Sequence, residues 1–159
     1  MMAILMLHLA ELPAHAALPC RAAALRLSLG GEEGDFNGMS HSGTLVVLRN
    51  RGGATCVLPA LPRIVMLDRR GRPLPIARAV PPGMHPEPVV SPVTVRPGTA
   101  VSTPLRWVSG PVFDRSRCYR PARLTVGGRS VAITANVCGE AGKAARMEQP
   151  PLAPLKRVS

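Results

Sequence analysis

The stretch from Gly43 to Cys56, GTLVVLRNRGGATC, constrains the fold more than any other part of the chain. The four consecutive apolar residues from Leu45 to Leu48 predict a strand that is apolar on both faces. Such a strand belongs in the middle of a packed sheet rather than at its edge. We expect it to end at Asn50, ahead of a turn at Gly52-Gly53. The rest of the chain is then expected to form shorter strands around this central one.

Composition agrees with a single β-rich domain. A chain of 159 residues that is 46% hydrophobic can bury one core. Its 18 prolines and 15 glycines are spread along the sequence, which is typical of many short strands joined by turns. With one Trp, one Tyr and two Phe, the core is expected to consist of Val, Leu, Ile, Ala and Met. We predict no helix and no internal repeat.

Alternating apolar and polar residues predict the remaining strands. The clearest element is a β-hairpin, in which the runs 122–126 and 131–137 flank Gly127-Gly128. A second hairpin is expected to pair 64–67 with 74–77 around the turn at 68–71, and Pro73 and Pro75 would place 74–77 at a sheet edge. Further strands are expected at 25–29, 56–58 and 101–107, and polar or proline-rich loops at 30–42 and 81–92.

Seven to nine such strands predict an antiparallel β-sandwich over residues 17–139, with a partly open barrel as the alternative. Trp107 alternates in step with Val101 and Leu105, so we expect it to pack in the core. After Gly139 the alternation is lost. Residues 140–159 are therefore predicted to form a poorly ordered tail, with one possible edge strand near 152–155.

The N-terminus resembles a secretory signal peptide. Met2 to Ala10 is apolar apart from His8, and Ala14-His15-Ala16 fits an A-x-A cleavage site, so we expect residues 1–16 to be removed. No basic residue precedes the apolar run, and the true start codon could lie upstream. Pro19 before Cys20 argues against lipid attachment. No other stretch has the roughly 18 consecutive apolar residues of a membrane span. The expected location is periplasmic or extracellular.

The four cysteines, Cys20, Cys56, Cys118 and Cys138, contain no C-x-x-C pair, which disfavours zinc ribbons and thioredoxin-like chemistry. In an exported chain an even number predicts two disulfides, with three possible pairings. The alternative is four free thiols in a cytosolic protein. Cys118 and Cys138 bracket the Gly127-Gly128 hairpin and would come to lie opposite each other, within bridging distance. We therefore predict Cys20–Cys56 and Cys118–Cys138. The pairing of 20 with 138 and 56 with 118 requires both termini to meet beside the Asn50 turn.

A net charge of +11 could indicate a nucleic-acid or an anionic-envelope partner. The basic residues are scattered, with no run longer than Asp68 to Arg72, and few aromatic residues accompany them. Single-stranded nucleic-acid sites usually combine basic residues with stacking aromatics. We therefore favour a solvated arginine-rich surface and expect no nucleic-acid partner.

An enzymatic reading is disfavoured, and we expect no cofactor. Gly38-Met39-Ser40-His41-Ser42 comes near the G-x-S-x-G nucleophile elbow, but Ser42 replaces the last glycine and no helical pattern follows. The six Glu and three Asp form no spaced pair that suggests acid–base work.

A soft-metal carrier is the sharper alternative. Met39 and His41 lie in one predicted loop, and Met84 and His85 lie in another. Thioether sulfur combined with imidazole is the chemistry that selects Cu(I). The four side chains could form one site only if the two loops converge.

One succession of residues resembles the exported bacterial domain of unknown function 4232. It runs from Cys20 to Gly139 and comprises Asn50-x-Gly52-x-x-x-Cys56-x-Leu58 with Pro62, Pro97-Gly98, Leu105-x-Trp107, Cys118 and Val137-Cys138-Gly139. The resemblance implies a small immunoglobulin-like sandwich of a secreted protein or lipoprotein, with no established activity. The chain has Ala60-Leu61-Pro62 where that pattern has a glycine before the proline, and it lacks the lipid-anchored or linker-bearing N-terminus. Three functions follow, in order of preference: a non-catalytic interaction or structural module whose partner is an unknown envelope component, a copper or soft-metal carrier, and a hydrolase.

Overall fold

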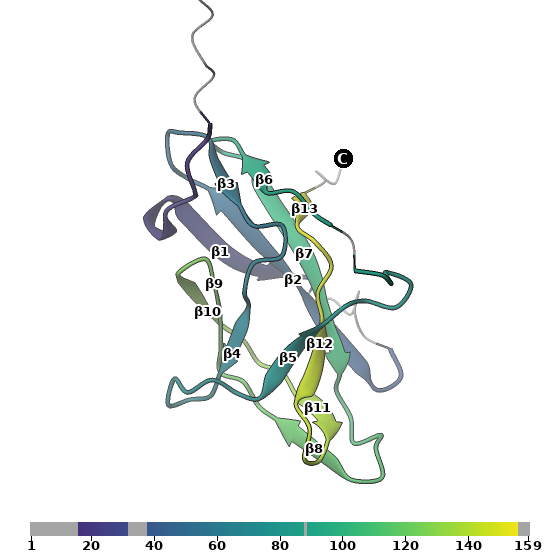
Figure 1. Cartoon of the computed structure of the whole chain (residues 1–159). Coiled ribbons are helices and arrows are strands. Elements are labelled where there is room, and N and C mark those ends of the chain that lie inside the picture. Colours follow the sequence, from purple (N-terminus) through teal and green to yellow (C-terminus); the bar gives the residue numbers. More distant parts are fainter. Residues whose placement is uncertain (1–15, 32–37, 88, 156–159) are drawn as a thin grey trace, which may run out of the picture.

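The computed structural model describes residues 16–31, 38–87 and 89–155, and these residues form a nearly all-β fold (Figure 1). One short 3-10 turn, η1 (Ala22–Ala24), precedes the first strand. The strands are β1 (Leu25–Gly30), β2 (His41–Asn50), β3 (Cys56–Leu58), β4 (Val65–Leu67), β5 (Ile76–Ala79), β6 (Val93–Val95), β7 (Ala100–Val108), β8 (Ser116–Tyr119), β9 (Arg123–Val126), β10 (Arg129–Ala132), β11 (Val137–Glu140), β12 (Ala145–Glu148) and β13 (Ala153–Pro154). The strands outnumber the seven to nine that were predicted. All except β1, β2 and β7 have at most four residues.

Strand β2 is the central strand that the sequence predicts. The main sheet has the order β1-β2-β7-β12-β5, and β13 pairs with β7. Leu48 lies opposite Leu27 on one side and Val101 on the other. The two faces of β2 are unequally covered, because Val46 and Leu48 are fully buried whereas Leu45 and Val47 are half-buried.

Three smaller sheets complete the fold, with the orders β10-β9-β4, β11-β8 and β3-β6. Buried residues of β2 and β7 form a single core cluster with Met66 of β4 and Leu124 of β9. Trp107 belongs to this cluster and is 4% exposed, so its predicted place in the core is confirmed. The described part of the chain contains no helix of the length and hydropathy that a membrane crossing requires.

The hairpin at Gly127-Gly128 is confirmed, but its second strand is shorter than predicted. β9 and β10 pair antiparallel, and both glycines have positive φ angles of 59° and 74°. The pairing ends at Ala132, whereas the prediction continued it to Val137. Val137 instead begins β11, which pairs with β8. Asn136 marks the departure, because its side-chain amide donates a 2.9 Å hydrogen bond to the carbonyl of Ser109, beyond the end of β7.

The predicted hairpin between 64–67 and 74–77 is only partly correct. Leu67 makes a single bridge to Pro73, but β4 takes β9 as its main partner. β5 does lie at a sheet edge, as the prolines predicted, and there it pairs parallel with β12. The main sheet is therefore mixed rather than purely antiparallel.

The prediction of a poorly ordered tail from residue 140 is wrong for the described residues. β12 lies inside the main sheet between β7 and β5, and its Ala145 and Met147 are almost completely buried. Gln149 follows, 1% exposed, and its side-chain amide donates to the carbonyl of Pro62 at 2.9 Å. The expected edge strand near 152–155 is present as the two-residue strand β13. This segment completes the sheet and the core.

Two disulfides join the chain in the predicted pairing. Cys20 is bonded to Cys56 with a Cα–Cα distance of 4.8 Å, and Cys118 is bonded to Cys138 with a distance of 4.0 Å. Cys118 and Cys138 lie directly opposite each other in the β8–β11 pair. The bridge therefore spans two neighbouring antiparallel strands, although these are not the strands of the Gly127-Gly128 hairpin.

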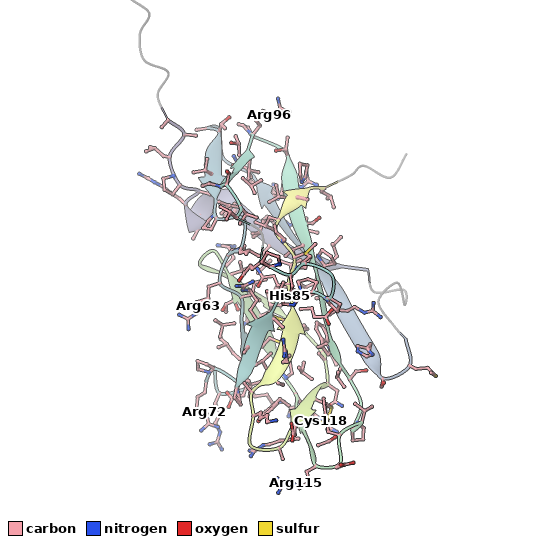
Figure 2. The ribbon with its side chains drawn as sticks, turned by 45° about the vertical axis from the view of Figure 1, so that its right-hand side comes forward. Arg63, Arg72, His85, Arg96, Arg115 and Cys118 are labelled. Atoms are coloured by element: carbon pink, nitrogen blue, oxygen red, sulfur yellow. A yellow bond between two sulfur atoms is a disulfide. The ribbon has the colours of Figure 1, made fainter. Side chains whose placement is uncertain are left out.

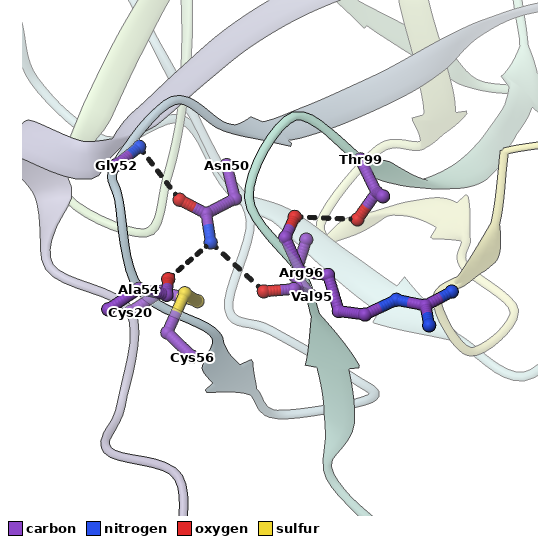
Figure 3. Close-up of a disulfide and its surroundings, with 8 residues drawn as sticks. All are labelled: Cys20, Asn50, Gly52, Ala54, Cys56, Val95, Arg96 and Thr99. Carbon is purple, nitrogen blue, oxygen red and sulfur yellow. Dashed lines mark hydrogen bonds between the residues drawn. A yellow bond between two sulfur atoms is a disulfide. The ribbon is translucent and has the colours of Figure 1, made fainter.

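The Cys20–Cys56 bridge lies beside a fully buried asparagine at the end of β2 (Figure 3). The side-chain amide of Asn50 donates to the carbonyls of Ala54 at 2.8 Å and Val95 at 2.9 Å. Its side-chain oxygen accepts from the backbone N–H of Gly52 at 2.9 Å. Asn50 thus fixes the turn after β2 and joins it to β6. The predicted signal peptide, residues 1–16, lies outside the described residues except for Ala16.

Candidate functional site

A pocket of about 600 Å³ opens where strands β7 and β12 separate. β12 pairs with β5 along its whole length, but it pairs with β7 only at Met147 and Glu148. Nearer the start of β12, Arg146 has no partner on β7. The pocket is lined by residues of both strands, of β11 and the turn after it, and of the segment after β5. A volume of this size is typical of small-molecule sites.

Two arginines from neighbouring strands line this pocket. Arg106 of β7 lies opposite Glu148 of β12. Residues two apart on a strand share a face, so Arg146 lies on the same face as Glu148 and diagonal to Arg106. Among the described residues, no ion pair or hydrogen bond engages either guanidinium group. Both side chains are exposed.

Two glutamates line the described part of the pocket, and one of them, Glu140, is neutralised by an ion pair. Glu140, at the end of β11, accepts a 2.6 Å ion-paired hydrogen bond from Lys143 in the turn that leads to β12. Glu148 has no ion-pair partner among the described residues. Arg106, Arg146 and Glu148 are therefore the charged groups of the pocket whose charge no neighbour balances.

Apolar groups form the rest of the wall. Val108 at the end of β7 and Pro82 after β5 contribute, together with Phe113, which is 38% exposed. Trp107 also lines the pocket, and its indole N–H has no acceptor among the described residues. Because buried N–H groups are nearly always paired, an unpaired indole donor beside a pocket is unusual. The pocket thus combines cationic and apolar surface.

The structure brings together half of the predicted metal site. His41 at the start of β2 and His85 after β5 both line the pocket. Figure 2 labels His85 near the middle of the molecule. The Nδ1 atom of His41 lies 3.1 Å from the carbonyl of Met39, and because a carbonyl only accepts, Nδ1 carries the proton. In the neutral ring this leaves Nε2 with its lone pair.

The two methionines do not take part. Met39 is 95% exposed, Met84 is 39% exposed, and neither lines the pocket. Among the described residues, no three His, Cys, Asp or Glu side chains are grouped so that they could hold a metal ion. Of the predicted set, His41 and His85 line the pocket, whereas Met39 and Met84 do not.

The segment Gly38–Ser42 is a tight turn that leads into β2, not a strand-to-helix elbow. Gly38 and His41 exchange backbone hydrogen bonds of 3.1 and 3.2 Å across it. Ser40 has a positive φ of 58°, and its hydroxyl donates to the carbonyl of Met39 at 2.6 Å. The serine is thus bonded to its own loop, which is typical of loop serines.

A second charged surface surrounds the turn after β4. Asp68 accepts hydrogen bonds from the backbone N–H groups of Arg70 at 2.8 Å and Arg72 at 2.9 Å, and it forms an ion pair with the Arg72 guanidinium. The backbone hydrogen bond from Arg72 is the main reason why the pKa of this carboxyl lies below its ordinary value. Arg69, Arg70, Arg72 and Arg120 line a shallow hollow with Asp68. Figure 2 shows Arg72 and Arg115 toward one end of the molecule and Arg96 at the other.

Sequence reasoning missed Arg146 because it assigned residue 146 to a disordered tail. The alternation Ala145-Arg146-Met147-Glu148, with two apolar residues between two charged ones, was the available signal for a strand. Arg106 alternates with Leu105 and Trp107 and therefore lies on the opposite face of its strand, but nothing in the sequence indicated its neighbour across the sheet.

Comparison with known proteins identifies the family. No curated protein and no solved structure matches the chain. One family model matches residues 20–152, which is most of the chain and extends past β12. The chain therefore belongs to the family described as domain of unknown function (DUF4232).

Proposed function

We propose that this chain is an exported, non-catalytic interaction module of the cell envelope that binds its partner at the pocket between β7 and β12. The observation that carries the proposal is the pair of uncompensated arginines beside exposed apolar side chains in that pocket. Polar groups that no neighbour satisfies and apolar groups open to solvent are typical of binding sites. Among the described residues, Cys138 is the only one that brings a sulfur atom to the pocket, and this sulfur is held in a disulfide and offers no nucleophile.

Export is supported by the two disulfides. Disulfides persist in oxidising compartments and are rare in the cytosol. Both bridges also hold core elements, since Cys56 begins β3 and Cys138 lies within β11. A protein whose structure includes two such bonds is suited to the periplasm or the cell exterior.

Cell fractionation and N-terminal sequencing test the export proposal. The mature protein should be found outside the cytosol, begin at or near Ala17 and contain no alkylatable thiol. Ala14→Arg, which disrupts the A-x-A site, should leave the N-terminus uncleaved. Recovery of the unaltered chain from the cytosol with Met1 intact and four free thiols would contradict export.

Thermal unfolding in the presence of envelope extract tests the binding proposal. A ligand that binds only the folded state raises the Tm, by mass action. The extract should raise the Tm of the unaltered chain but not that of Val108→Trp, whose bulky uncharged side chain would fill the pocket. Arg26→Gln is the matched control, because Arg26 is an exposed strand arginine outside the pocket. Equal shifts for all three proteins, or none, would oppose binding at this site.

A Cu(I) carrier is the second candidate, because His41 and His85 line one pocket. Two imidazole nitrogens can bind Cu(I) without the thioethers, and imidazole is a ligand that copper favours. Competition with a chromophoric chelator should then show one Cu(I) per chain, lost in His41→Ala and in His85→Ala but retained in Met39→Ala. No binding tighter than micromolar would exclude this candidate.

A further inference from the structure

We infer that the pocket between β7 and β12 binds a small anionic molecule with an apolar, ring-containing body, whose acidic group is held by Arg106 and Arg146. This inference rests on the proposed function and names the class of ligand. Three observations carry it: the shared sheet face of the two arginines, the charge around them, and the apolar wall.

The two guanidinium groups are placed to act on one ligand. Arg106 lies opposite Glu148, and Arg146 lies two residues earlier on the same face of β12. Both residues line the same pocket, so both long side chains border the space that a ligand would occupy. Guanidinium groups bind carboxylates, sulfonates and phosphates through paired, charge-assisted hydrogen bonds.

The charge balance favours an anion. Lys143 and Glu140 neutralise each other through their ion pair. Glu148 could offset one arginine, yet it forms no ion pair with Arg106. Even if Glu148 turned toward Arg106, Arg146 would remain unbalanced. Arg106, Arg146 and Glu148 together therefore carry a net positive charge, which attracts an anion.

The wall and the size of the pocket favour a small molecule with a ring. Val108 and Phe113 offer apolar surface next to the arginines. Trp107 contributes to the same wall. The cavity of about 600 Å³ matches a small molecule rather than a macromolecular surface.

Two related dyes test the inference. 1-Anilinonaphthalene-8-sulfonate carries a sulfonate on a ring system, and N-phenyl-1-naphthylamine has the same rings without the charge. Trp107 is the single tryptophan of the chain, so energy transfer from tryptophan shows that a dye is bound to the protein, and the arginine variants show whether it is bound in the pocket. The measurement uses the disulfide-bonded chain well below its Tm, because partly unfolded proteins also bind such dyes.

The sulfonate dye should bind one per chain, with energy transfer from Trp107, and at least tenfold more tightly than the uncharged dye. Arg106→Gln with Arg146→Gln should weaken sulfonate binding at least tenfold and leave the uncharged dye unaffected. Arg26→Gln should change neither affinity. Both pocket arginines are exposed, so the variant should keep the Tm of the unaltered chain, and each single variant should give a smaller loss in the same direction.

The outcomes separate this inference from the proposed function. If both dyes bind equally and the arginine variants have no effect, the pocket binds apolar ligands and the anionic class is wrong. If envelope extract raises the Tm but the sulfonate dye shows no energy transfer, the inference fails while the proposed function stands. If neither the extract nor the dyes bind, both fail.

Discussion

Asn50 and Val95, which lie 45 residues apart in the sequence, are joined by a buried hydrogen bond of 2.9 Å from the asparagine amide to the valine carbonyl (Figure 3). The same amide also donates to Ala54, and its oxygen accepts from Gly52. Both kinds of polar atom in this side chain are therefore satisfied although the residue is fully buried. The contacts hold the end of β2, the following turn and β6 in one arrangement.

Asn50→Ala should lower the free energy of unfolding by about 3 kcal/mol. The replacement leaves two carbonyls and one N–H without their partners, and buried groups of this kind cost about 1–3 kcal/mol each before relaxation. Urea unfolding measures the change. Thr99→Ala is the control, since the Thr99 hydroxyl is exposed and bonds only Arg96 of its own turn, so less than about 1 kcal/mol is expected. An Asn50→Ala variant as stable as Thr99→Ala would show that the buried contacts contribute little.

Removing either disulfide should destabilise the fold, and removing Cys20–Cys56 should do so more. The bridges close loops with sequence separations of 36 and 20 residues. The loop-entropy relation gives about 4 kcal/mol for the longer loop and about 3 kcal/mol for the shorter one. Double alanine variants of each pair, unfolded in guanidinium chloride, measure these losses. Unchanged midpoints in either variant would argue that the corresponding bond contributes nothing to stability.

Gly139→Ala should destabilise the chain by about 2 kcal/mol. A Cβ atom at position 139 would lie 2.8 Å from the Cα of Ala145, and backbone at that distance must shift. Gly53→Ala is the matched control, because a Cβ there meets nothing within 4 Å. The two Tm values provide the comparison. If both variants lower the Tm equally, the close approach of β11 to β12 is not the reason why residue 139 must be glycine.

Deleting residues 145–159 should abolish cooperative unfolding. The deletion removes β12 from within the main sheet, including Met147, which is 1% exposed. Met147→Ala alone should cost about 3 kcal/mol, because it leaves a cavity in the core. A chain that ends at Leu155 retains β12 and β13 and should unfold like the whole chain. If the chain that lacks residues 145–159 unfolds cooperatively at an unchanged Tm, residues 145–159 are dispensable for the fold.

The sequence alone determined the class of fold and the chemistry that closes it. The apolar run of β2, the Gly127-Gly128 turn and the even number of cysteines each act through local rules of alternation, backbone freedom and thiol chemistry. These rules predicted the central strand, the β9–β10 hairpin and the presence of two disulfides, whereas the strands that bring Cys118 and Cys138 together are β8 and β11 rather than those of the predicted hairpin. They also predicted the burial of Trp107, because its alternation with Leu105 places both side chains on one face.

Only the tertiary structure decided which strands pair and what lies between them. The alternation of residues 145–148 is too short to distinguish a strand from a tail. These residues form a strand because β5 and β7 offer backbone hydrogen-bonding groups on either side of them, and no local pattern reveals such partners. The same holds for the candidate site. Arg106 and Arg146 are 40 residues apart, and they share a pocket because β12 pairs with β7 over two residues and then separates. A cross-strand register of this kind is a property of the assembled sheet, whereas alternation is a property of each strand alone.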